Sequence, residues 1–549
     1  MHNKPIHTSV TSGRGMVVAP QPEAVEAGVE ILKAGGNAVD AALGCAFVQT
    51  AVDPMMCGIA GFGSLAVYLP GVNGTHEYID FHAPAPLAAT PDMWQGLIES
   101  EARDGFSFRL RGRVNDLGYQ SICVPAALRG FYEAHRSYGR LPWSEIIDPA
   151  IRFAREGWFV RPAVYTFWSA EGEMGRADNT ERLAYSESGR KLFCRSDGSP
   201  KRIGEWVRNS DYANTLAAIA KEGPEVFYSG EMAAHIVQDM ASHGGLITAR
   251  DLASYRPRRN KPLQSTYRGY RVTTSQPPGG GAMLLEMLNI LENFDLSALR
   301  HNSVEYIVTV VEAMKRATID KDQYIGDPQF VEVPVGRLTS KEYAEELARD
   351  IRDGRRANVI RFSPSPASDT THVSVVDGEG ACVSLTHSLG MPSGVITSGL
   401  GFFYNGCMGA FDPRPNRAGS IAPGKSRFSG MCPSIVFCND LPFLAIGAPG
   451  GTQIPMGVLQ ALLNVIDFKM TLREAVASPR FSATSNIIDV VNRIPRAIGR
   501  SLNARGYEVA RNPYGYSIGW VHGIKLTQGH LEGAAEPGRD GVALATDDF

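Results

Sequence analysis

A pair of short apolar runs near residue 380 constrains the fold more than any other feature of this sequence. Thr371–Val376 (THVSVV) and Ala381–Thr386 (ACVSLT) are rich in β-branched residues, and Asp-Gly-Glu-Gly separates them. Asp and Gly readily adopt the backbone conformations of a tight turn, so the stretch predicts a β-hairpin. Residues 363–369, just before it, are rich in Ser and Pro, which favours an exposed, irregular segment. Thr370 therefore lies at a junction between exposed chain and a buried strand.

Helical patterns surround this hairpin on both sides. Pro22 and Gly35 bracket one helical pattern, and Asn37 is a suitable N-cap for a second helix that ends near Val52. The region from about residue 141 to 347 is dominated by helical periodicity. Further strands and one more helix are predicted at 65–69, 434–438, 443–447 and about 452–467. Intermixed strands and helices predict an α/β or layered α+β fold.

Composition excludes several classes of protein. The chain has 549 residues, of which 44% are hydrophobic, so it can bury a large core in two lobes or one large body. Its 54 basic and 57 acidic residues give a net charge of −3 without basic runs, which argues against nucleic acid as a partner. Residues 1–16 contain no apolar targeting segment and no later stretch is long and apolar enough to span a bilayer, so a cytoplasmic location is expected. The eight Cys include no C-x-x-C pair, and no structural disulfide is expected.

Common catalytic motifs are missing from the sequence. The twelve His show no metal-ligand spacing, and no G-x-S-x-G marks a hydrolase serine. The glycine-rich loops at 57–64 (CGIAGFGS) and 277–281 (PPGGG) match neither a P-loop nor a dinucleotide fingerprint, so neither a metal nor a cofactor is expected. What remains is Asp369-Thr370-Thr371-His372, which by itself is typical of a loop that enters a hairpin.

Several motifs, in order along nearly the whole chain, resemble the γ-glutamyltranspeptidase family of N-terminal-nucleophile hydrolases. They are VVAPQPEAVEAGVEILKAGGNAVDAAL, CGIAGFGS, TTHVSVVDGEGACVSLT, FSGMCPSIVF and IGAPGGTQIPMGVLQ. The resemblance implies an α+β fold, a four-layer αββα sandwich. It also implies a precursor that cleaves itself between Asp369 and Thr370. Residues 1–369 would then form a large chain and 370–549 a small chain, intertwined as a heterodimer that could pair with a second copy.

The resemblance also assigns roles to individual residues. Thr370, as the new N-terminus, would supply both the nucleophilic hydroxyl and, through its α-amine of ordinary pKa about 7.7–8.0, the general base. Gly450 and Gly451 match the pair whose N–H groups stabilise the oxyanion. Ser388 matches the hydroxyl residue that orients the nucleophile, and Ser429 matches the first of two serines that hold the substrate's carboxylate.

Other positions depart from the family pattern where it binds the glutamyl donor. His82 stands in place of the Arg that holds the α-carboxylate, and Gly409-Ala410 replaces the acidic pair that holds the α-ammonium. Gly390, Cys407 and Gly430 replace an Asn, an acidic or amide residue and the second serine. Loss of both charged contacts argues against a zwitterionic amino-acid head group. The resemblance thus predicts intact acyl-transfer chemistry with a changed acyl pocket.

Two cations on a loop before Ser429 are candidates for binding a carboxylate. Lys425 and Arg427 could neutralise it from a new direction, although loop cations are more often simply solvated. Family branches with altered recognition include glutaryl-cephalosporin acylases and oxamate amidohydrolases. We therefore expect an amidohydrolase, also capable of acyl transfer, that acts on a small acidic acyl amide.

Three alternatives remain open from the sequence. The first is a true γ-glutamyltransferase or glutathione hydrolase that binds its donor with other residues. The second is an unprocessed relative that binds a ligand without catalysis and does not need Thr370. The third is nucleotide binding through the glycine-rich loops.

Overall fold

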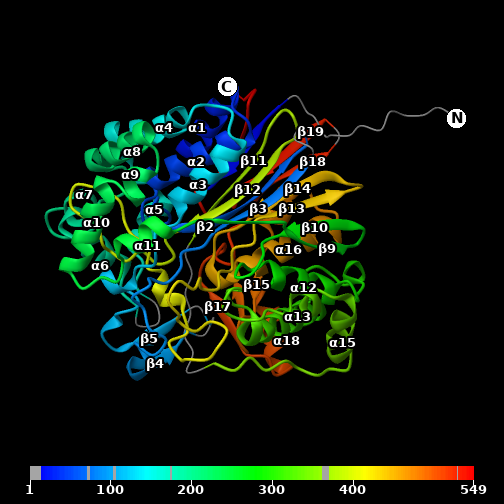
Figure 1. Cartoon of the computed structure of the whole chain (residues 1–549). Helices are drawn as coiled ribbons and strands as arrows, with labels where there is room; N and C mark the ends of the chain where they lie inside the picture. The colour runs from blue at the N-terminus through cyan, green and yellow to red at the C-terminus, as the bar shows by residue number, and fades with distance from the viewer. Residues whose placement is uncertain are drawn as a thin grey trace.

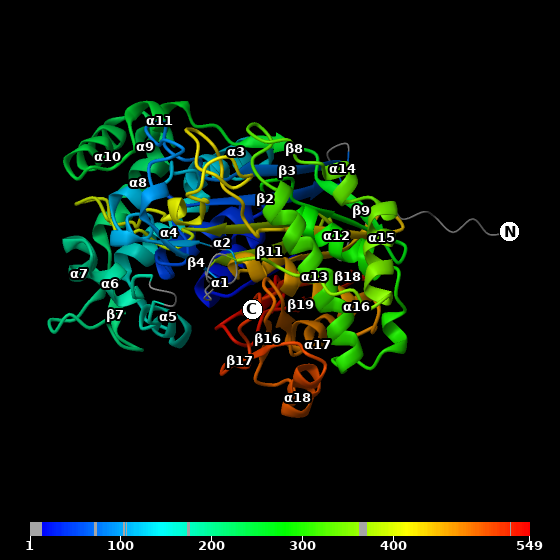
Figure 2. The same cartoon turned by 90° about the horizontal axis from the view of Figure 1, so that it is seen from below.

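Two antiparallel sheets pack face to face between two layers of helices in the computed structural model (Figures 1 and 2). The structure describes residues 14–70, 74–102, 105, 107–172, 176–361, 370–527 and 529–548. The irregular segment predicted at 363–369 lies outside the described residues. The four layers confirm the predicted α+β sandwich.

The first sheet has seven strands in the order β20-β1-β11-β12-β2-β3-β8. The predicted hairpin lies at its centre as β11 and β12, whose register pairs Thr371 with His387 and Val376 with Cys382. The strands of this sheet are β1 (Met16–Ala19), β2 (Phe62–Leu69), β3 (Thr75–Phe81), β8 (Arg258–Asn260), β11 (Thr371–Val376), β12 (Cys382–Ser388) and β20 (Val542–Ala545).

The second sheet has six strands in the order β19-β18-β14-β13-β10-β9. Its strands are β9 (Leu263–Tyr267), β10 (Tyr270–Thr274), β13 (Ser434–Cys438), β14 (Leu441–Gly447), β18 (His522–Thr527) and β19 (His530–Ala534). The region from 141 to 347 is helix-rich as predicted, but it also contains strands that the sequence analysis did not predict, among them β8, β9 and β10. These strands are short and carry polar residues on partly exposed faces, so they lack the apolar alternation that marks a strand in the sequence.

Apolar side chains fill the space between the two sheets. Residues from both sheets form this inner core: Val18, Ala66, Val376, Cys382, Ile435, Phe437, Ala445, Ile524, Leu526 and Leu531. The hairpin is therefore buried on both faces, which explains its continuous rather than alternating apolar pattern.

Helices cover the outer face of each sheet. α1 (Pro22–Lys33) and α2 (Ala38–Val52) cover the first sheet, and Asn37 and Asp40 form the capping box that starts α2. Smaller helices and short two-stranded sheets form the lobe beside them (Figure 1). The helices of this side of the molecule are α3 (Ala127–Tyr138), α4 (Trp143–Glu156), α5 (Pro162–Trp168), α6 (Asn179–Ala184), α7 (Glu187–Phe193), α8 (Ser210–Glu222), α9 (Glu225–Tyr228), α10 (Glu231–Ser242) and α11 (Ala249–Ser254).

The second sheet is covered by helices from the later part of the chain. α12 (Gly281–Leu291) and α16 (Ile454–Ile466) are buried along their whole length, as their mostly apolar sequences require. The other helices of this side are α13 (Val304–Tyr324), α14 (Val335–Leu338), α15 (Lys341–Arg352), α17 (Leu472–Ala477) and α18 (Arg496–Ala504). Three strands, β15 (Phe481–Ser482), β16 (Ile488–Val491) and β17 (Val509–Asn512), form a separate small sheet.

Within the described residues, no helix is both long and apolar enough to cross a membrane. All eight cysteines are free thiols, and Cys438 is the only one that is not fully buried.

Buried neutral histidines near the hairpin give the fold a defined pH dependence. Burial lowers the pKa of His387 to about 3, and burial together with nearby arginines lowers the pKa of His522 to about 3. The unfolded chain takes up these protons near pH 6.5, so the stabilisation is complete above that pH and is lost as pH falls toward 3. We expect His387→Asn to reduce the slope of unfolding free energy against pH between 4 and 6 by up to about 1.4 kcal/mol per pH unit. Equal slopes in urea titrations of the two proteins would contradict this assignment.

Candidate active site

Thr370 is the residue immediately before β11, the first strand of the central hairpin. Its side chain is 4% exposed, and Thr371 beside it pairs with His387. The pairing of β11 with β12 ends there, and the same register continued by one residue would set Thr370 opposite Ser388. Asp369, the other half of the predicted cleavage site, is outside the described residues. The roles of Thr370 and Ser388 stay predictions, and the register is compatible with them.

Polar side chains that sequence reasoning missed hold the residue after the nucleophile. The Nε2 atoms of Gln21 and Gln49 donate hydrogen bonds to Thr371 Oγ1 at 3.3 and 3.2 Å. Gln49 Oε1 lies 2.8 Å from Nε2 of His387, and Gln21 also donates to Asp53 Oδ2 at 2.9 Å. All five residues are buried. This network fixes the backbone of the strand on which Thr370 is mounted.

Strand β14 of the second sheet leads the chain toward Thr370. Ser384 Oγ donates to the Ile446 carbonyl at 3.0 Å, and the His372 ring packs against Gly447, where an added Cβ would lie 2.2 Å from it. In the hairpin Ser384 pairs with Ser374, and His372 lies two residues closer to Thr370 than Ser374 does. Because Ile446 contacts Ser384 and Gly447 contacts His372, the chain from Ile446 to Gly447 runs toward the Thr370 end of the hairpin. Gly450 and Gly451 follow the end of this strand by three and four residues, which is compatible with a position near the Thr370 end of the hairpin.

Gly450 and Gly451 have backbone conformations that only glycine adopts easily. Their φ angles are 142° and 57°; Gly450 caps and Gly451 begins the short 3-10 turn Gly451–Gln453 that leads into α16. Two adjacent glycines without side chains let the backbone approach a bound group closely. The oxyanion role of their N–H groups stays a prediction.

Ser388 is fully buried at the end of β12. Its Oγ accepts a hydrogen bond from the Gly390 N–H at 2.8 Å, which fixes the side chain beside the Thr370 position. This placement is compatible with its predicted task of orienting the nucleophile.

Gly430 packs directly against the predicted oxyanion pair. A Cβ at this position would lie 2.0 Å from the Gly451 carbonyl oxygen, so position 430 admits no side chain. The preceding Ser429 is 3% exposed, donates its N–H to the Pro278 carbonyl at 2.9 Å and accepts the Met431 N–H on its Oγ at 3.3 Å. The second serine of the family pattern is therefore replaced by close backbone packing.

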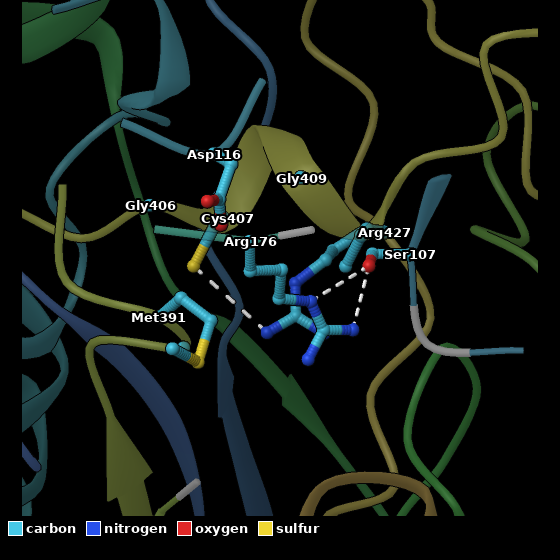
Figure 3. Close-up of a pocket in the computed structure, with 10 residues that line it drawn as sticks. Ser107, Asp116, Arg176, Met391, Gly406, Cys407, Gly409 and Arg427 are labelled. Carbon is cyan, nitrogen blue, oxygen red and sulfur yellow. Dashed lines mark hydrogen bonds between the residues drawn. The ribbon is translucent and has the colours of Figure 1, made fainter. Parts of the chain in front are cut away.

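A small cavity of about 10 Å³ gathers most of the positions that depart from the family pattern (Figure 3). Its lining residues come from six segments of the chain: Ser107, Asp116, Arg176, Gly390, Met391, Gly406, Cys407, Gly409, Ala410 and Arg427. Gly390, one of the lining residues, follows Ser388 by two residues and donates its N–H to the Ser388 Oγ. Sequence reasoning had identified Arg427 but not Arg176 or Ser107.

The two loop cations of the sequence analysis are not solvated charges. Lys425 and Arg427 are each only 3% exposed. Lys425 Nζ donates to the Ala418 carbonyl at 2.8 Å and does not line the cavity, whereas Arg427 does. The expectation of plain solvated loop charges is therefore wrong, because the loop folds back into the core.

His82 lines a different cavity from Arg427. It contributes to a space of about 360 Å³ with Asp80, Tyr255 and other residues, and its Nδ1 lies 2.5 Å from Asp80 Oδ1. The His82 ring also lies 5.9 Å from the ring of Phe62. The Arg427 guanidinium lies 4.4 Å from the same Phe62 ring, so His82 and Arg427 are near each other although they line different cavities.

Comparison with known proteins agrees with this geometry. A family model described as gamma-glutamyltranspeptidase matches residues 24–546. The chain belongs to this family. It is 37% identical over 540 residues to an acylase ACY 1 proenzyme of Pseudomonas sp. (strain V22), a match that covers 97% of this chain and 94% of that protein. It is 32% identical over 549 residues to a glutathione hydrolase proenzyme of Escherichia coli (strain K12), covering 96% and 91%.

A solved structure extends the agreement to three dimensions. The crystal structure of a cephalosporin acylase from Bacillus halodurans matches with a TM-score of 0.86 and 31% identity, and covers 99% of this chain and 98% of that one. This γ-glutamyltranspeptidase family member therefore has the N-terminal-nucleophile hydrolase fold and belongs to a class of hydrolases and transferases. Both sequence relatives are described as proenzymes, and the predicted family and fold are confirmed.

Proposed function

We propose that this γ-glutamyltranspeptidase family member is the precursor of an amidohydrolase that cleaves itself between Asp369 and Thr370. In this step the Thr370 hydroxyl attacks the Asp369 carbonyl carbon, the C–N bond breaks, and the nitrogen takes the hydroxyl proton. This acyl shift frees the α-amine of Thr370, and water then hydrolyses the resulting ester to release the Asp369 carboxylate and restore the Thr370 hydroxyl. The large chain 1–369 and small chain 370–549 would stay together, because strands of both build the first sheet.

The processed enzyme then uses the same residue on its substrate. The α-amine of Thr370 removes the hydroxyl proton, the oxygen attacks the amide carbonyl, and the N–H groups of Gly450 and Gly451 stabilise the oxyanion. The proton passes to the leaving amine, and water resolves the acyl-enzyme. An amine in place of water would give acyl transfer. Ser388 orients the nucleophile.

The residues that line the cavity of Arg427 support a small acidic acyl group as substrate. Arg427, a buried cation, lines the cavity together with Gly409 and Ala410, which stand where the family pattern has the acidic pair for an α-ammonium. A site with a cation and without that acidic pair favours a carboxylate over a zwitterion. This observation carries the proposal. Ser429 and His82 stay predictions as substrate contacts, as does the cytoplasmic location.

Hydrolysis of paired chromogenic amides tests this proposal. We expect the processed protein to hydrolyse glutaryl-p-nitroanilide and to prefer it over γ-glutamyl-p-nitroanilide, which differs only by the α-ammonium, by at least about 30-fold in kcat/KM. The reverse preference, enhanced by glycylglycine, would instead establish a γ-glutamyltransferase with altered donor contacts. Inactivity on both, with an intact chain, would favour a non-catalytic binding protein.

A further inference from the structure

Gln49 is a fully buried amide in the mostly apolar helix α2, which packs against both strands of the central hairpin (Figure 1). A buried amide costs free energy unless it is hydrogen-bonded, so an apolar side chain would pack at this position more cheaply. We infer that Gln49 is a positioning residue, whose amide holds the end of β11 so that Thr370 lies correctly for its attack. This inference rests on the proposed amidohydrolase function and adds a residue on which its rate depends.

The Gln49 side chain joins the two strands of the hairpin. Its Nε2 donates to Thr371 Oγ1 at 3.2 Å and to the His372 carbonyl at 3.4 Å, and its Oε1 lies 2.8 Å from Nε2 of His387. Thr371 of β11 and His387 of β12 are paired in the ladder. One amide therefore spans the last pair of the hairpin before Thr370.

The groups around Gln49 determine which way its amide points. The His372 carbonyl only accepts hydrogen bonds, so the Gln49 nitrogen faces it and the Gln49 oxygen faces His387. His387 then carries its proton on Nε2, which agrees with burial that lowers its pKa to about 3 and keeps the ring neutral. On the other side, Gln21 Oε1 accepts from Gln49 Nε2 at 2.7 Å, and Gln21 Nε2 donates to Asp53 Oδ2 at 2.9 Å. Both amides thus have a single orientation in this network.

The network acts on Thr370 through the backbone. Thr371 Oγ1 accepts hydrogen bonds from both Gln49 and Gln21, the latter at 3.3 Å. Consecutive Cα atoms are about 3.8 Å apart, so a fixed Thr371 limits where Thr370 can lie. A displacement of about 1 Å in a reacting group can lower a rate by about 100-fold. Loss of the Gln49 amide should therefore slow attack by Thr370 both on the Asp369 carbonyl and on the substrate.

Gln49→Met tests this role, because it keeps the length of the side chain and removes its hydrogen-bonding atoms. We expect it to lower kcat per cleaved chain for glutaryl-p-nitroanilide by about 10-fold to 100-fold, with KM within about 3-fold of the parent. Self-cleavage of newly made precursor should slow by a similar factor.

The matched control is Gln460→Met, at another buried amide in a mostly apolar helix. Gln460 lies in α16 and donates to the Met456 and Phe481 carbonyls, both at 2.8 Å. Its replacement also removes buried hydrogen bonds, so it should destabilise the protein about as much as Gln49→Met does. Because these bonds do not involve the hairpin, kcat and the rate of self-cleavage should stay within about 2-fold of the parent.

A second variant removes the hydroxyl that the Gln49 amide binds. Thr371→Val keeps the shape of the side chain and should lower kcat by about 10-fold, whereas Thr371→Ser keeps the oxygen and should stay within about 3-fold of the parent. Since both single variants remove one shared contact, the double variant Gln49→Met/Thr371→Val should lose less than the product of the two single losses. Losses that multiply fully would show that the two residues act separately and would contradict the inference.

Self-cleavage separates this inference from the proposed function, because it needs no added substrate. If the parent is cleaved and active while Gln49→Met and Thr371→Val match it in cleavage rate and kcat, the positioning role is wrong and the amidohydrolase stands. If Gln460→Met loses as much rate as Gln49→Met, the loss reflects stability alone and the positioning role is again wrong. If the parent chain stays intact and inactive, the proposed function fails and the positioning role fails with it.

Discussion

Replacement of Thr370 by Ala is expected to leave a single chain of 59.4 kDa and to lower amide hydrolysis by at least about 10⁴-fold. The physical reason is that Thr370 supplies the attacking hydroxyl, and cleavage of the peptide bond before it frees the α-amine that serves as the base. Without the hydroxyl, the peptide bond before residue 370 is not attacked, so no α-amine appears either. Denaturing electrophoresis and glutaryl-p-nitroanilide hydrolysis measure both effects.

The matched variant for this prediction is Thr370→Ser, which keeps the hydroxyl. It should still yield two fragments and retain measurable activity, because a serine hydroxyl performs the same attack. A Thr370→Ala protein that is cleaved and active like the parent would contradict the assignment of the nucleophile. The circular dichroism spectrum of the Ala variant should be that of a folded protein. The substitution removes only the hydroxyl and methyl groups of one side chain next to a strand.

Gly430→Ala is expected to lower kcat by about 10² to 10³-fold, the effect typical of losing one oxyanion-hole donor. A methyl group at 430 would lie 2.0 Å from the Gly451 carbonyl oxygen, so the backbone at 451 must move. Because that movement tilts the Gly451 N–H away from the oxyanion, the loss should fall on kcat more than on KM. Steady-state kinetics on the glutaryl amide, with thermal unfolding in parallel, measure it.

Gly336→Ala is the control for this substitution. No atom lies within 4 Å of a Cβ at 336, and this glycine is in the short helix α14, so the change should leave kcat and stability nearly unaltered. If Gly430→Ala keeps full kcat while it remains folded, Gly451 does not contribute to the oxyanion site in the way proposed. A rise in KM alone would lead to the same conclusion.

Local pattern predicted much of the scaffold. The hairpin of β11 and β12, the capped helix after Asn37 and the strand–glycine–helix run around Gly450 each contain their own signal within a few residues. Family resemblance then identified Thr370, which directly precedes β11, and Ser388, which ends the neighbouring strand β12. These features follow from short-range turn chemistry and apolar runs, which a sequence displays directly.

The cavity could not be predicted in the same way. Arg176, Ser107 and Arg427 come from segments far apart in the chain, and nothing in their local sequence indicates that they converge. Gln49 stands in an apolar helix without any sign that it contacts Thr371. The loss of the family's charged contacts indicated a changed acyl pocket, but only the three-dimensional packing shows that Arg176 and Arg427 line the same cavity.

The central claim is that this chain is a self-processing N-terminal-threonine enzyme. Intact mass and N-terminal sequencing of the purified 549-residue protein test it most directly. We predict two fragments, the smaller of which begins Thr370-Thr371-His372. A single uncleaved chain of 59.4 kDa, or a fragment that begins at another residue, would contradict the account.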